Sequence, residues 1–422
     1  MNIKILNKTW EEVMALPRPK HKKPIRPNIF WRTLVRVLSQ FDKDVIACRC
    51  NFPEKKKLPK EPYLILMNHS SFLDMKLASK ILYPMPYQIV CTSDAMMGLE
   101  WLMRRIGCIP TAKFVSDMTL LKDMKYALTK TKTSVLMYPE AGYTFDGCSV
   151  RLPDNFGSLC KLLKVPVIMI TTHGAFLQKP LFAALRTRKV KVSADVKMIL
   201  SATDVKEKSA AEINDVIKEA FSFDGFRYQQ ENKIRIDESD RAEGLERILY
   251  KCCHCDAEGN METEGTILRC KVCGKEYALD EYGALKAQGG KSRFTHVPDW
   301  YNWERDAVKA ELDDGTYSLD SETEIMMAVD YKAIYNIGNG RLIHGENGFS
   351  LYDDKGKLLY EHSPLTSHSV CADFYWYEKG DVIGIGTKEE TYYCLLKDSH
   401  KVTKMRLAAE ELYQKIRPRT DR

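Results

Sequence analysis

Short apolar runs alternate with helical stretches between residues 60 and 200, and this rhythm restricts the possible folds more than any other feature. The runs have strand length and read "YLILM" (63–67), "PYQIVC" (86–91), "SVLMYP" (134–139), "VPVIMITT" (165–172) and "VKVSADVKMIL" (190–200). Helical patterns such as "SDMTLLKDMKYALTKT" separate them, and "SAAEINDVIKEAFSFD" (209–224) reads as a closing helix. Alternation of this kind predicts an α/β domain over residues 56–235, with a largely parallel sheet flanked by helices.

The chain extends well beyond this domain. Its 422 residues suggest two to four domains. After a polar linker, a cysteine-rich segment predicts a small zinc ribbon over residues 245–290. From about residue 316, short alternating runs broken by "GENG", "DDKGK" and "EKGD" are typical of hairpins. With the amphipathic helix that ends the chain, they predict a β-rich, barrel-like domain over residues 295–422, similar in layout to pleckstrin-homology domains.

Positive charge is concentrated at the N-terminus. Residues 1–60 hold 15 Lys and Arg against 5 Asp and Glu, or +10, so the net charge of +7 leaves −3 for the remainder. A basic arm of this kind implies an anionic partner, either a lipid surface or a nucleic acid. We therefore treat residues 1–55 as a separate segment, made of a basic arm and an amphipathic helix.

The amphipathic helix is predicted within "NIFWRTLVRVLSQF" (28–41). One face of this helix is apolar, because its large apolar residues recur at helical spacing: Phe30, Leu34, Val37 and Phe41. Arg32 and Arg36 point to the opposite face. Such a helix can dock on the protein's own core, lie in a membrane interface with Trp31 near the headgroups, or do both.

Two absences in the sequence bear on location. No apolar run reaches the length of about 18–20 residues that spans a bilayer, and the N-terminus does not resemble a signal peptide. The expectation is an intracellular protein, cytoplasmic and attached peripherally to the inner face of a membrane. The thirteen cysteines are then expected to stay reduced.

Four cysteines form two pairs with metal-binding spacing. They are Cys252 and Cys255, followed after 14 residues by Cys270 and Cys273. This pattern predicts a structural Zn²⁺ held by four thiolates, which staples a segment too small to bury its own core. His254 is an alternative ligand, although the paired spacing favours the cysteines. The mixed local charge argues against nucleic acid as a partner.

A histidine and an aspartate follow the first strand. The run "YLILMNHSSFLD" ends its strand at Met67, and a turn that starts a new helix would bring His69 and Asp74 together. A carboxylate that orients an imidazole makes a general base suited to an alcohol. Alternatively, Ser71 and Asp74 form a pattern similar to a capping box, in which Asp74 only caps the helix.

Three later stretches, read together with this pair, resemble a known family. They are "GCIPTAK" (107–113), "MYPEAGYT" (137–144) and "VPVIMI" (165–170). Their order and spacing are similar to the four blocks of the glycerolipid acyltransferases of the lysophosphatidate acyltransferase type. The resemblance covers about residues 60–200.

The resemblance implies a reaction and roles for individual residues. His69 would be the general base that deprotonates the acceptor hydroxyl, and Asp74 its orienting partner. The substrate-binding residues would be Asn68, Gly107, Lys113, Glu140 and Gly142. The acyl donor would be acyl-CoA or acyl-carrier protein, and the acceptor a glycerol phosphate or lysophospholipid, with no metal in the reaction.

The third block departs from the family. Where the family has Gly-Thr-Arg-Ser after the glutamate, this chain has "AGYT", so the arginine expected to hold the acceptor's phosphate is missing. Lys113, Lys161 or Arg151 are candidates to replace it; otherwise the acceptor differs. This departure supports a second hypothesis, a non-catalytic zinc-ribbon interaction protein that uses the acyltransferase fold as a lipid-binding module.

Overall fold

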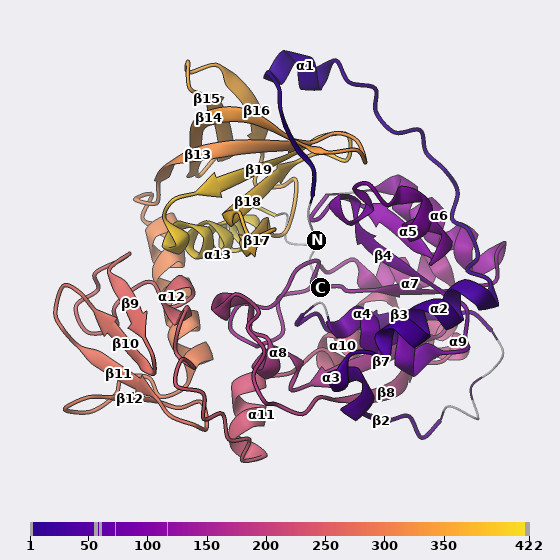
Figure 1. Cartoon of the computed structure of the whole chain (residues 1–422), viewed down its shortest axis with the longest axis horizontal. Helices are drawn as coiled ribbons and strands as arrows, with labels where there is room; N and C mark the ends of the chain where they lie inside the picture. Colours follow the sequence, from indigo (N-terminus) through magenta and orange to yellow (C-terminus); the bar gives the residue numbers. More distant parts are fainter. Residues whose placement is uncertain (1–2, 55–57, 59–60, 72, 116, 418–422) are drawn as a thin grey trace.

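The computed structural model describes residues 3–54, 58, 61–71, 73–115 and 117–417 (Figure 1). Its first large unit is a seven-stranded sheet with the spatial order β2-β8-β7-β3-β6-β4-β5. The strands are β2 (Arg49–Asn51), β3 (Leu64–Met67), β4 (Tyr87–Thr92), β5 (Cys108–Thr111), β6 (Ser134–Met137), β7 (Val167–His173) and β8 (Ser193–Leu200). Neighbouring strands run parallel, except that β8 is antiparallel to β7. The predicted sheet is confirmed, but it is mixed.

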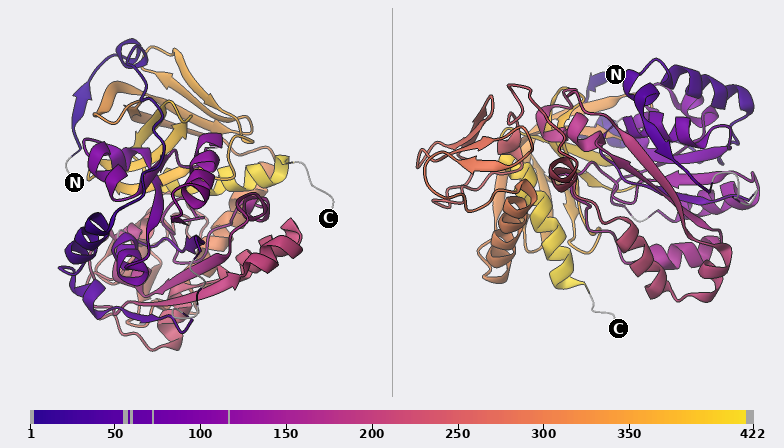
Figure 2. Two further views of the ribbon diagram at one scale, coloured as in Figure 1. Left: turned by 90° about the vertical axis from the view of Figure 1, so that its right-hand side faces the viewer. Right: turned by 90° about the horizontal axis from the view of Figure 1, so that it is seen from below.

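Helices cover both faces of this sheet, as the right-hand view of Figure 2 shows. Successive side chains of β3 point to opposite faces. Ile65 and Met67 pack towards α4 (Leu73–Leu82), whereas Leu64 and Leu66 pack towards the opposite layer. That layer consists of α6 (Met118–Thr129), α7 (Phe156–Leu163) and α10 (Ala210–Ala220). Burial on both faces explains why β3 is apolar throughout rather than alternating.

Short helices fill the connections. They are η1 (Ser93–Met96), α5 (Glu100–Arg105), α8 (Ala175–Gln178), η2 (Leu181–Ala183), α9 (Ala202–Glu207), α11 (Gly225–Glu231) and η3 (Leu245–Arg247). Capping boxes start α9 at Ser201 and α10 at Ser209. The predicted closing helix at 209–224 is therefore confirmed as α10, which begins one residue after its serine cap.

The cysteine-rich segment forms a small antiparallel sheet. Its four strands follow the order β12-β11-β10-β9 and comprise β9 (Met261–Glu264), β10 (Ile267–Cys270), β11 (Glu276–Leu279) and β12 (Leu285–Ala287). This sheet is attached to the following helix through its first knuckle. The carboxylate of Glu304 accepts a hydrogen bond from the backbone N–H of Lys251 at 2.7 Å, and the indole of Trp300 donates to the Lys251 carbonyl at 2.9 Å.

A second large sheet follows, as predicted for the C-terminal region. The strands are β13 (Leu319–Ala328), β14 (Ile334–Gly345), β15 (Gly348–Asp353), β16 (Leu358–His362), β17 (Cys371–Trp376), β18 (Gly380–Gly386) and β19 (Thr391–Leu396). Their order is β16-β15-β14-β13-β19-β18-β17. Among the described residues no strand pairing joins β16 to β17, so the expected closure into a barrel is not shown.

Two long helices accompany this sheet. The final helix α13 (Ser399–Ile416) was predicted and lies against the sheet. The preceding α12 (Val297–Asp313) was not predicted, because the region after residue 295 was read as β-rich. Its Pro298 occupies the first turn, where a proline costs no helical hydrogen bond. The helices α12 and α13 pack side by side (Figure 2).

The N-terminal segment divides between the two large sheets. Strand β1 (Ile5–Asn7) pairs in parallel with β14, so the indigo start of the chain lies beside the C-terminal sheet in Figure 1. Helix α1 (Trp10–Met14) follows, and the Trp10 indole donates to the Tyr392 hydroxyl at 3.1 Å. The sequence did not predict this docking, because a strand of three residues gains its stability from a distant partner.

The predicted amphipathic helix is α2 (Ile29–Ser39), which is followed by α3 (Lys43–Ala47). It lies against α4, with the Thr33 hydroxyl 3.2 Å from that of Tyr83 and the Trp31 ring 5.7 Å from that of Trp101. Other apolar side chains of this region remain exposed, including Phe30 at 62% and Phe41 at 80%. Within the described residues, no helix is long and apolar enough to cross a bilayer.

Candidate active site

The turn after β3 brings His69 and Asp74 into contact. Strand β3 ends at Met67, α4 begins at Leu73, and Asp74 lies in its first turn. The Asp74 Oδ2 atom lies 3.1 Å from His69 Nδ1 and accepts hydrogen bonds from the backbone N–H groups of Ser70 at 2.7 Å and Ser71 at 2.9 Å. Asp74 therefore both caps the helix and orients the imidazole, so the two readings of the sequence are compatible.

The hydrogen bond to Asp74 determines the tautomer of His69. An ionised carboxylate only accepts, so Nδ1 carries the proton and Nε2 presents its lone pair. Nε2 has no hydrogen-bond partner among the described residues. The ring lies between Tyr138 and Tyr143, whose ring centroids are 4.0 and 4.3 Å away. The His69 side chain is 21% exposed, so the ring is not sealed inside the protein.

Burial lowers the pKa of His69 below the ordinary value for an imidazole. The hydrogen bond and charge of Asp74 oppose this shift, whereas the charge of Lys113 adds to it. A lowered pKa keeps the imidazole neutral near pH 7, which is the form that accepts a proton. The electrostatic surroundings therefore suit a general base.

Glu140 holds the loop that carries His69. It lies three residues beyond the end of β6 and is 1% exposed. Its Oε2 atom accepts a hydrogen bond from the His69 backbone N–H at 2.6 Å, and its Oε1 atom accepts one from that of Val150 at 3.4 Å. Burial raises the pKa of Glu140 to about 8, against the lowering effect of these two bonds. These contacts support a positioning role for Glu140, whereas the family resemblance implied that it binds substrate.

Asn68 and Gly142 differ in how tightly they are held. The Asn68 Oδ1 atom accepts from the backbone N–H of Thr172 at 2.7 Å, and its Nδ2 atom donates to the Thr172 carbonyl at 3.0 Å, which ties the ends of β3 and β7 together. Gly142 has open space where a side chain would lie. Its neighbour Ala141 adopts a φ of 52°, a conformation that glycine favours.

Gly107 and Lys113 lie at opposite ends of β5. Gly107 precedes the strand, and a Cβ atom there would lie 2.7 Å from Pro27 Cγ, so close packing explains this glycine. Lys113 follows the strand, at the same edge as His69 and Glu140, because β3, β5 and β6 run in the same direction. The structure therefore brings Lys113 towards the candidate site and leaves Gly107 away from it.

The other candidate cations have partners elsewhere. Lys161 donates to the carbonyls of Val205, Lys206 and Lys208 at the end of α9. Arg151 forms an ion pair of 2.9 Å with Glu411 of α13. Of the three cations considered from the sequence, Lys113 is the one whose charge acts on the His69 imidazole.

The four cysteines form a compact cluster, as their spacing predicted. Their sulfur atoms lie within 4.8 Å of one another, with Cys252 and Cys273 at 3.8 Å and Cys255 and Cys270 at 3.7 Å. Four thiolates arranged tetrahedrally around Zn²⁺ at about 2.3 Å would have sulfurs about 3.8 Å apart, so the cluster fits such an ion. His254 is exposed and lies outside the cluster.

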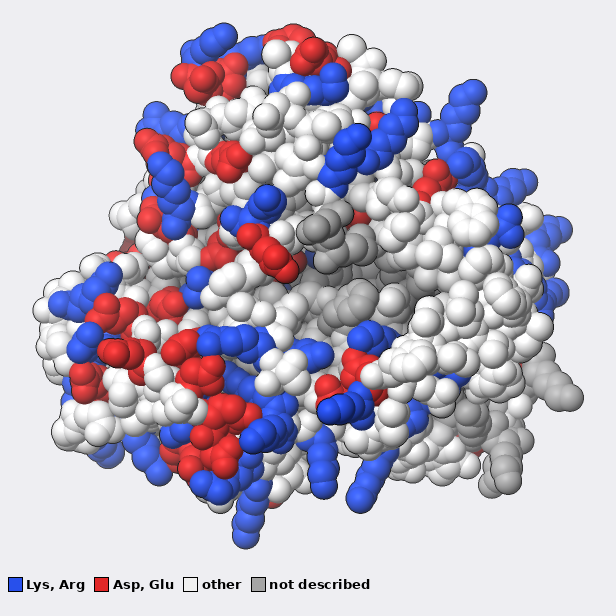
Figure 3. Space-filling model, in the orientation of Figure 1, with Lys and Arg blue, Asp and Glu red and all other residues white. Residues whose placement is uncertain are grey.

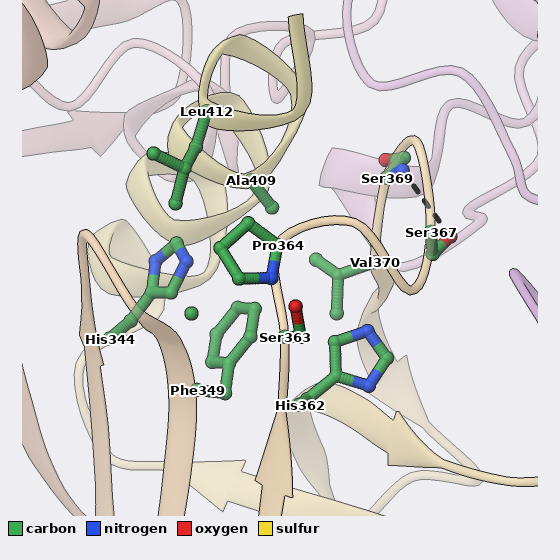
Figure 4. A pocket seen from close by; sticks show the side chains of 11 residues that line it. His344, Phe349, His362, Ser363, Pro364, Ser367, Ser369, Val370, Ala409 and Leu412 are labelled. Carbon is green, nitrogen blue, oxygen red and sulfur yellow. Dashed lines mark hydrogen bonds between the residues drawn. The ribbon is translucent and has the colours of Figure 1, made fainter. Parts of the chain in front are cut away.

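A small pocket lies in the C-terminal region, lined only by residues between 344 and 412 (Figure 4). His344 and His362 face it beside Phe349. Burial lowers the pKa of His344 to about 3 and that of His362 to about 4, so both rings are neutral. None of the described residues that line this pocket carries a charged side chain, so the lining offers a phosphate no cation.

An imidazole fixed by a carboxylate at the end of a buried strand is an arrangement that can serve as a general base. Comparison with known proteins assigns this part of the chain to a family. Residues 49–173 match the model of the acyltransferase family. The chain therefore carries an acyltransferase-family domain, as the resemblance of its motifs implied.

The remaining comparisons add little to this assignment. One similar solved structure is the 1-acyl-sn-glycerophosphate (LPA) acyltransferase from Thermotoga maritima, with 14% sequence identity and a TM-score of 0.36 over 45% of this chain and 76% of that one. A likeness this distant does not bear on the substrate. No curated protein sequence matches the chain.

Proposed function

We propose that this protein is a peripheral membrane O-acyltransferase. It transfers a fatty acyl group from acyl-CoA or acyl-carrier protein to the hydroxyl of a glycerol phosphate or lysophospholipid. The contact of 3.1 Å between His69 and Asp74, inside the segment that matches the acyltransferase family, is the observation that carries the proposal. The region around residues 245–422 then regulates or recruits the enzyme.

The proposed mechanism follows from the tautomer of His69. Its Nε2 atom takes the proton of the acceptor hydroxyl while the oxygen attacks the thioester carbonyl carbon. Asp74 stabilises the imidazolium that forms. The tetrahedral intermediate collapses, the carbon–sulfur bond breaks, and the thiolate leaves with the proton from Nε2. The products are the ester and the free thiol, and the histidine is neutral again.

The reaction is tested with purified protein, liposomes and an acyl-CoA, by following release of free thiol. The acceptors are glycerol 3-phosphate, lysophosphatidate, other lysophospholipids and a neutral monoacylglycerol. We expect release with a phosphate-bearing acceptor. Release only with monoacylglycerol would keep the chemistry and change the acceptor class. If every acceptor is silent with both acyl-CoA and acyl-carrier protein, the hypothesis of a lipid-binding module replaces the enzyme.

The membrane surface we propose lies around α2. Its exposed apolar side chains are Ile29, Phe30, Val37, Leu38 and Phe41, with Ile46, Leu99 and Trp101 on neighbouring elements. Lys and Arg side chains gather on the right-hand edge of Figure 3, the side on which Figure 1 shows the chain between α1 and α2. Exposed apolar groups on the same side of a protein as cations suit insertion into an anionic leaflet. One face of α2 packs against α4 and another is exposed, so this helix can both dock on the protein and lie in a membrane interface.

Replacing Phe30 and Phe41 by serine is expected to weaken binding to anionic vesicles at least tenfold. Each phenylalanine that enters a membrane contributes about 1.5–3 kcal/mol, and tenfold corresponds to about 1.4 kcal/mol. Cosedimentation with vesicles containing phosphatidylglycerol measures the effect. As a control, Leu365→Ser changes an apolar residue that is 48% exposed in the C-terminal region. Equal binding by all variants would place the membrane contact elsewhere.

A further inference from the structure

Tyr143 occupies the position at which the family's third block has its arginine. Its ring lies against the His69 ring, with centroids 4.3 Å apart. Its backbone carbonyl accepts a hydrogen bond of 3.3 Å from Nη1 of Arg406, a residue of α13. A guanidinium from the C-terminal region therefore lies directly beside the loop that lacks one.

Arg406 is held firmly in this place. Its guanidinium lies over the Phe145 ring, 4.2 Å from the centroid, and its Nε atom donates to Glu410 at 3.2 Å. Glu410 is itself fixed by Arg305 at 2.7 Å and by Ser369 at 2.9 Å. Arg406 is 4% exposed, yet its Nη2 group donates to no described residue. The Nη2 N–H groups of Arg406 therefore remain available as donors, on a guanidinium whose orientation is already fixed by Phe145 and Glu410.

The packing around Arg406 keeps α13 against the acyltransferase domain. The rings of Phe145 and Phe374 lie 4.6 Å apart, and Arg151 pairs with Glu411 of α13 at 2.9 Å. These contacts surround the loop between Glu140 and Arg151, which braces the backbone of His69. The loop whose Tyr143 ring lies against His69 therefore also carries the contacts to α13.

Lys113 is a second cation near this boundary. Together with Cys371 and residues of β18 and β19, it lines a narrow pocket between the two regions. Burial acts to lower the pKa of Lys113, but the neighbouring Cys371, Asp373 and Asp94 together outweigh this effect. The pKa of Lys113 is therefore raised above its ordinary value, and the amine is charged. The charge of Arg406 acts on both Lys113 and Glu140, which places these groups in one neighbourhood.

We propose that Arg406 of α13, together with Lys113, binds the phosphate of the acyl acceptor, so that the C-terminal region completes the acyltransferase site. This inference rests on the proposed function. A guanidinium offers two parallel donors to phosphate oxygens, whereas a lysine acts as a point charge. The arginine absent from the sequence motif is thus supplied by a residue about 260 positions later in the chain.

The test compares Arg406→Gln with Arg151→Gln in the full-length protein. Both changes remove an arginine that links α13 to the acyltransferase domain, but Arg151 pairs with Glu411 and does not contact Tyr143. We expect Arg406→Gln to lower kcat/KM for lysophosphatidate roughly 10- to 100-fold, mainly through KM. The KM for acyl-CoA and turnover of monoacylglycerol should stay unchanged, and Arg406→Lys should recover part of the loss.

A binding measurement separates this inference from the proposed function. Calorimetric titration with a short-chain lysophosphatidate, the matching monoacylglycerol and inorganic phosphate reports the site even if no turnover occurs. The proposal is supported if Arg406→Gln weakens the binding of lysophosphatidate but not that of monoacylglycerol. If Arg406→Gln weakens the binding of inorganic phosphate to the same extent, the site is assigned to free phosphate. Equal losses for lysophosphatidate and monoacylglycerol, a raised KM for acyl-CoA, or an identical effect of Arg151→Gln would overturn it.

Discussion

Replacing His69 by alanine is expected to lower acyl transfer by about 10²–10⁴-fold, the usual contribution of a positioned general base. The folded structure should persist, because the hydrogen bond from the His69 backbone to Glu140 does not need the imidazole. Thiol release and the melting temperature, measured on the same preparations, check both parts of this expectation.

His173→Ala is the matched control for this variant. The His173 ring pairs with Asp195 at 3.0 Å and stacks on Tyr228, and neither partner belongs to the His69–Asp74 pair, so acyl transfer should be retained. If His69→Ala kept full activity, or lost activity only because it unfolded, His69 would not be the base.

The pH profile provides an independent signature of the same residue. Because burial lowers the pKa of His69, the neutral base persists to lower pH, and the acid limb of kcat/KM should have its midpoint below about 6.5. Asp74 raises that pKa, so Asp74→Asn should move the limb to still lower pH while it reduces the maximal rate. A limb that moved to higher pH would contradict this arrangement.

Removing the metal that we propose for the four-cysteine cluster is expected to unfold β9–β12 locally. Structural zinc contributes on the order of 10 kcal/mol to such small sites, more than a sheet of this size gains from its own core. A strong chelator should release about one equivalent of zinc, measured by elemental analysis, and Cys270→Ser should prevent zinc from binding. Either change should abolish hydrogen-exchange protection in this sheet. Loosening should extend to α12, because Glu304 and Trp300 are tied to Lys251 at the first knuckle.

Cys253→Ser is the control for metal removal. Cys253 lies inside the same knuckle and is buried, but its sulfur faces the Tyr277 hydroxyl at 3.2 Å rather than the cluster. The Cys253→Ser variant should therefore keep its metal content and lose only a little of its free energy of unfolding. A structural zinc would be excluded if the purified protein contained no metal and its hydrogen exchange did not change when a chelator was added.

Local patterns were sufficient for much of the fold. The apolar runs at 63–67 and 165–172 predicted β3 and β7 because strands buried on both faces are continuously apolar. The turn between Met67 and Leu73 was likewise predictable, since His69 and Asp74 are only five positions apart and backbone geometry alone joins them. The cysteine cluster was predicted from the spacing of its two pairs, because four thiolates at this spacing are typical of a zinc site.

Helix α12 was missed because the region after residue 295 was read as β-rich, although its buried residues Val297, Trp300, Tyr301, Val308 and Leu312 recur at helical spacing. Other features depend on partners that no local pattern reveals. Strand β1 was missed because it pairs with β14, more than 300 residues away. The role of Glu140 as a brace for the His69 backbone depends on two loops that meet only in the folded chain.

The sequence by itself determined two local features: a histidine oriented by an aspartate at the end of a buried strand, and the paired spacing of the four-cysteine cluster. Both depend on short stretches whose geometry follows from bonding along the chain. Only the tertiary structure decided what surrounds that histidine, because Tyr143 and Arg406 are separated by 263 positions and meet only when α13 packs against the loop after β6. Long-range packing, which no local motif encodes, therefore determines what borders the candidate acceptor site.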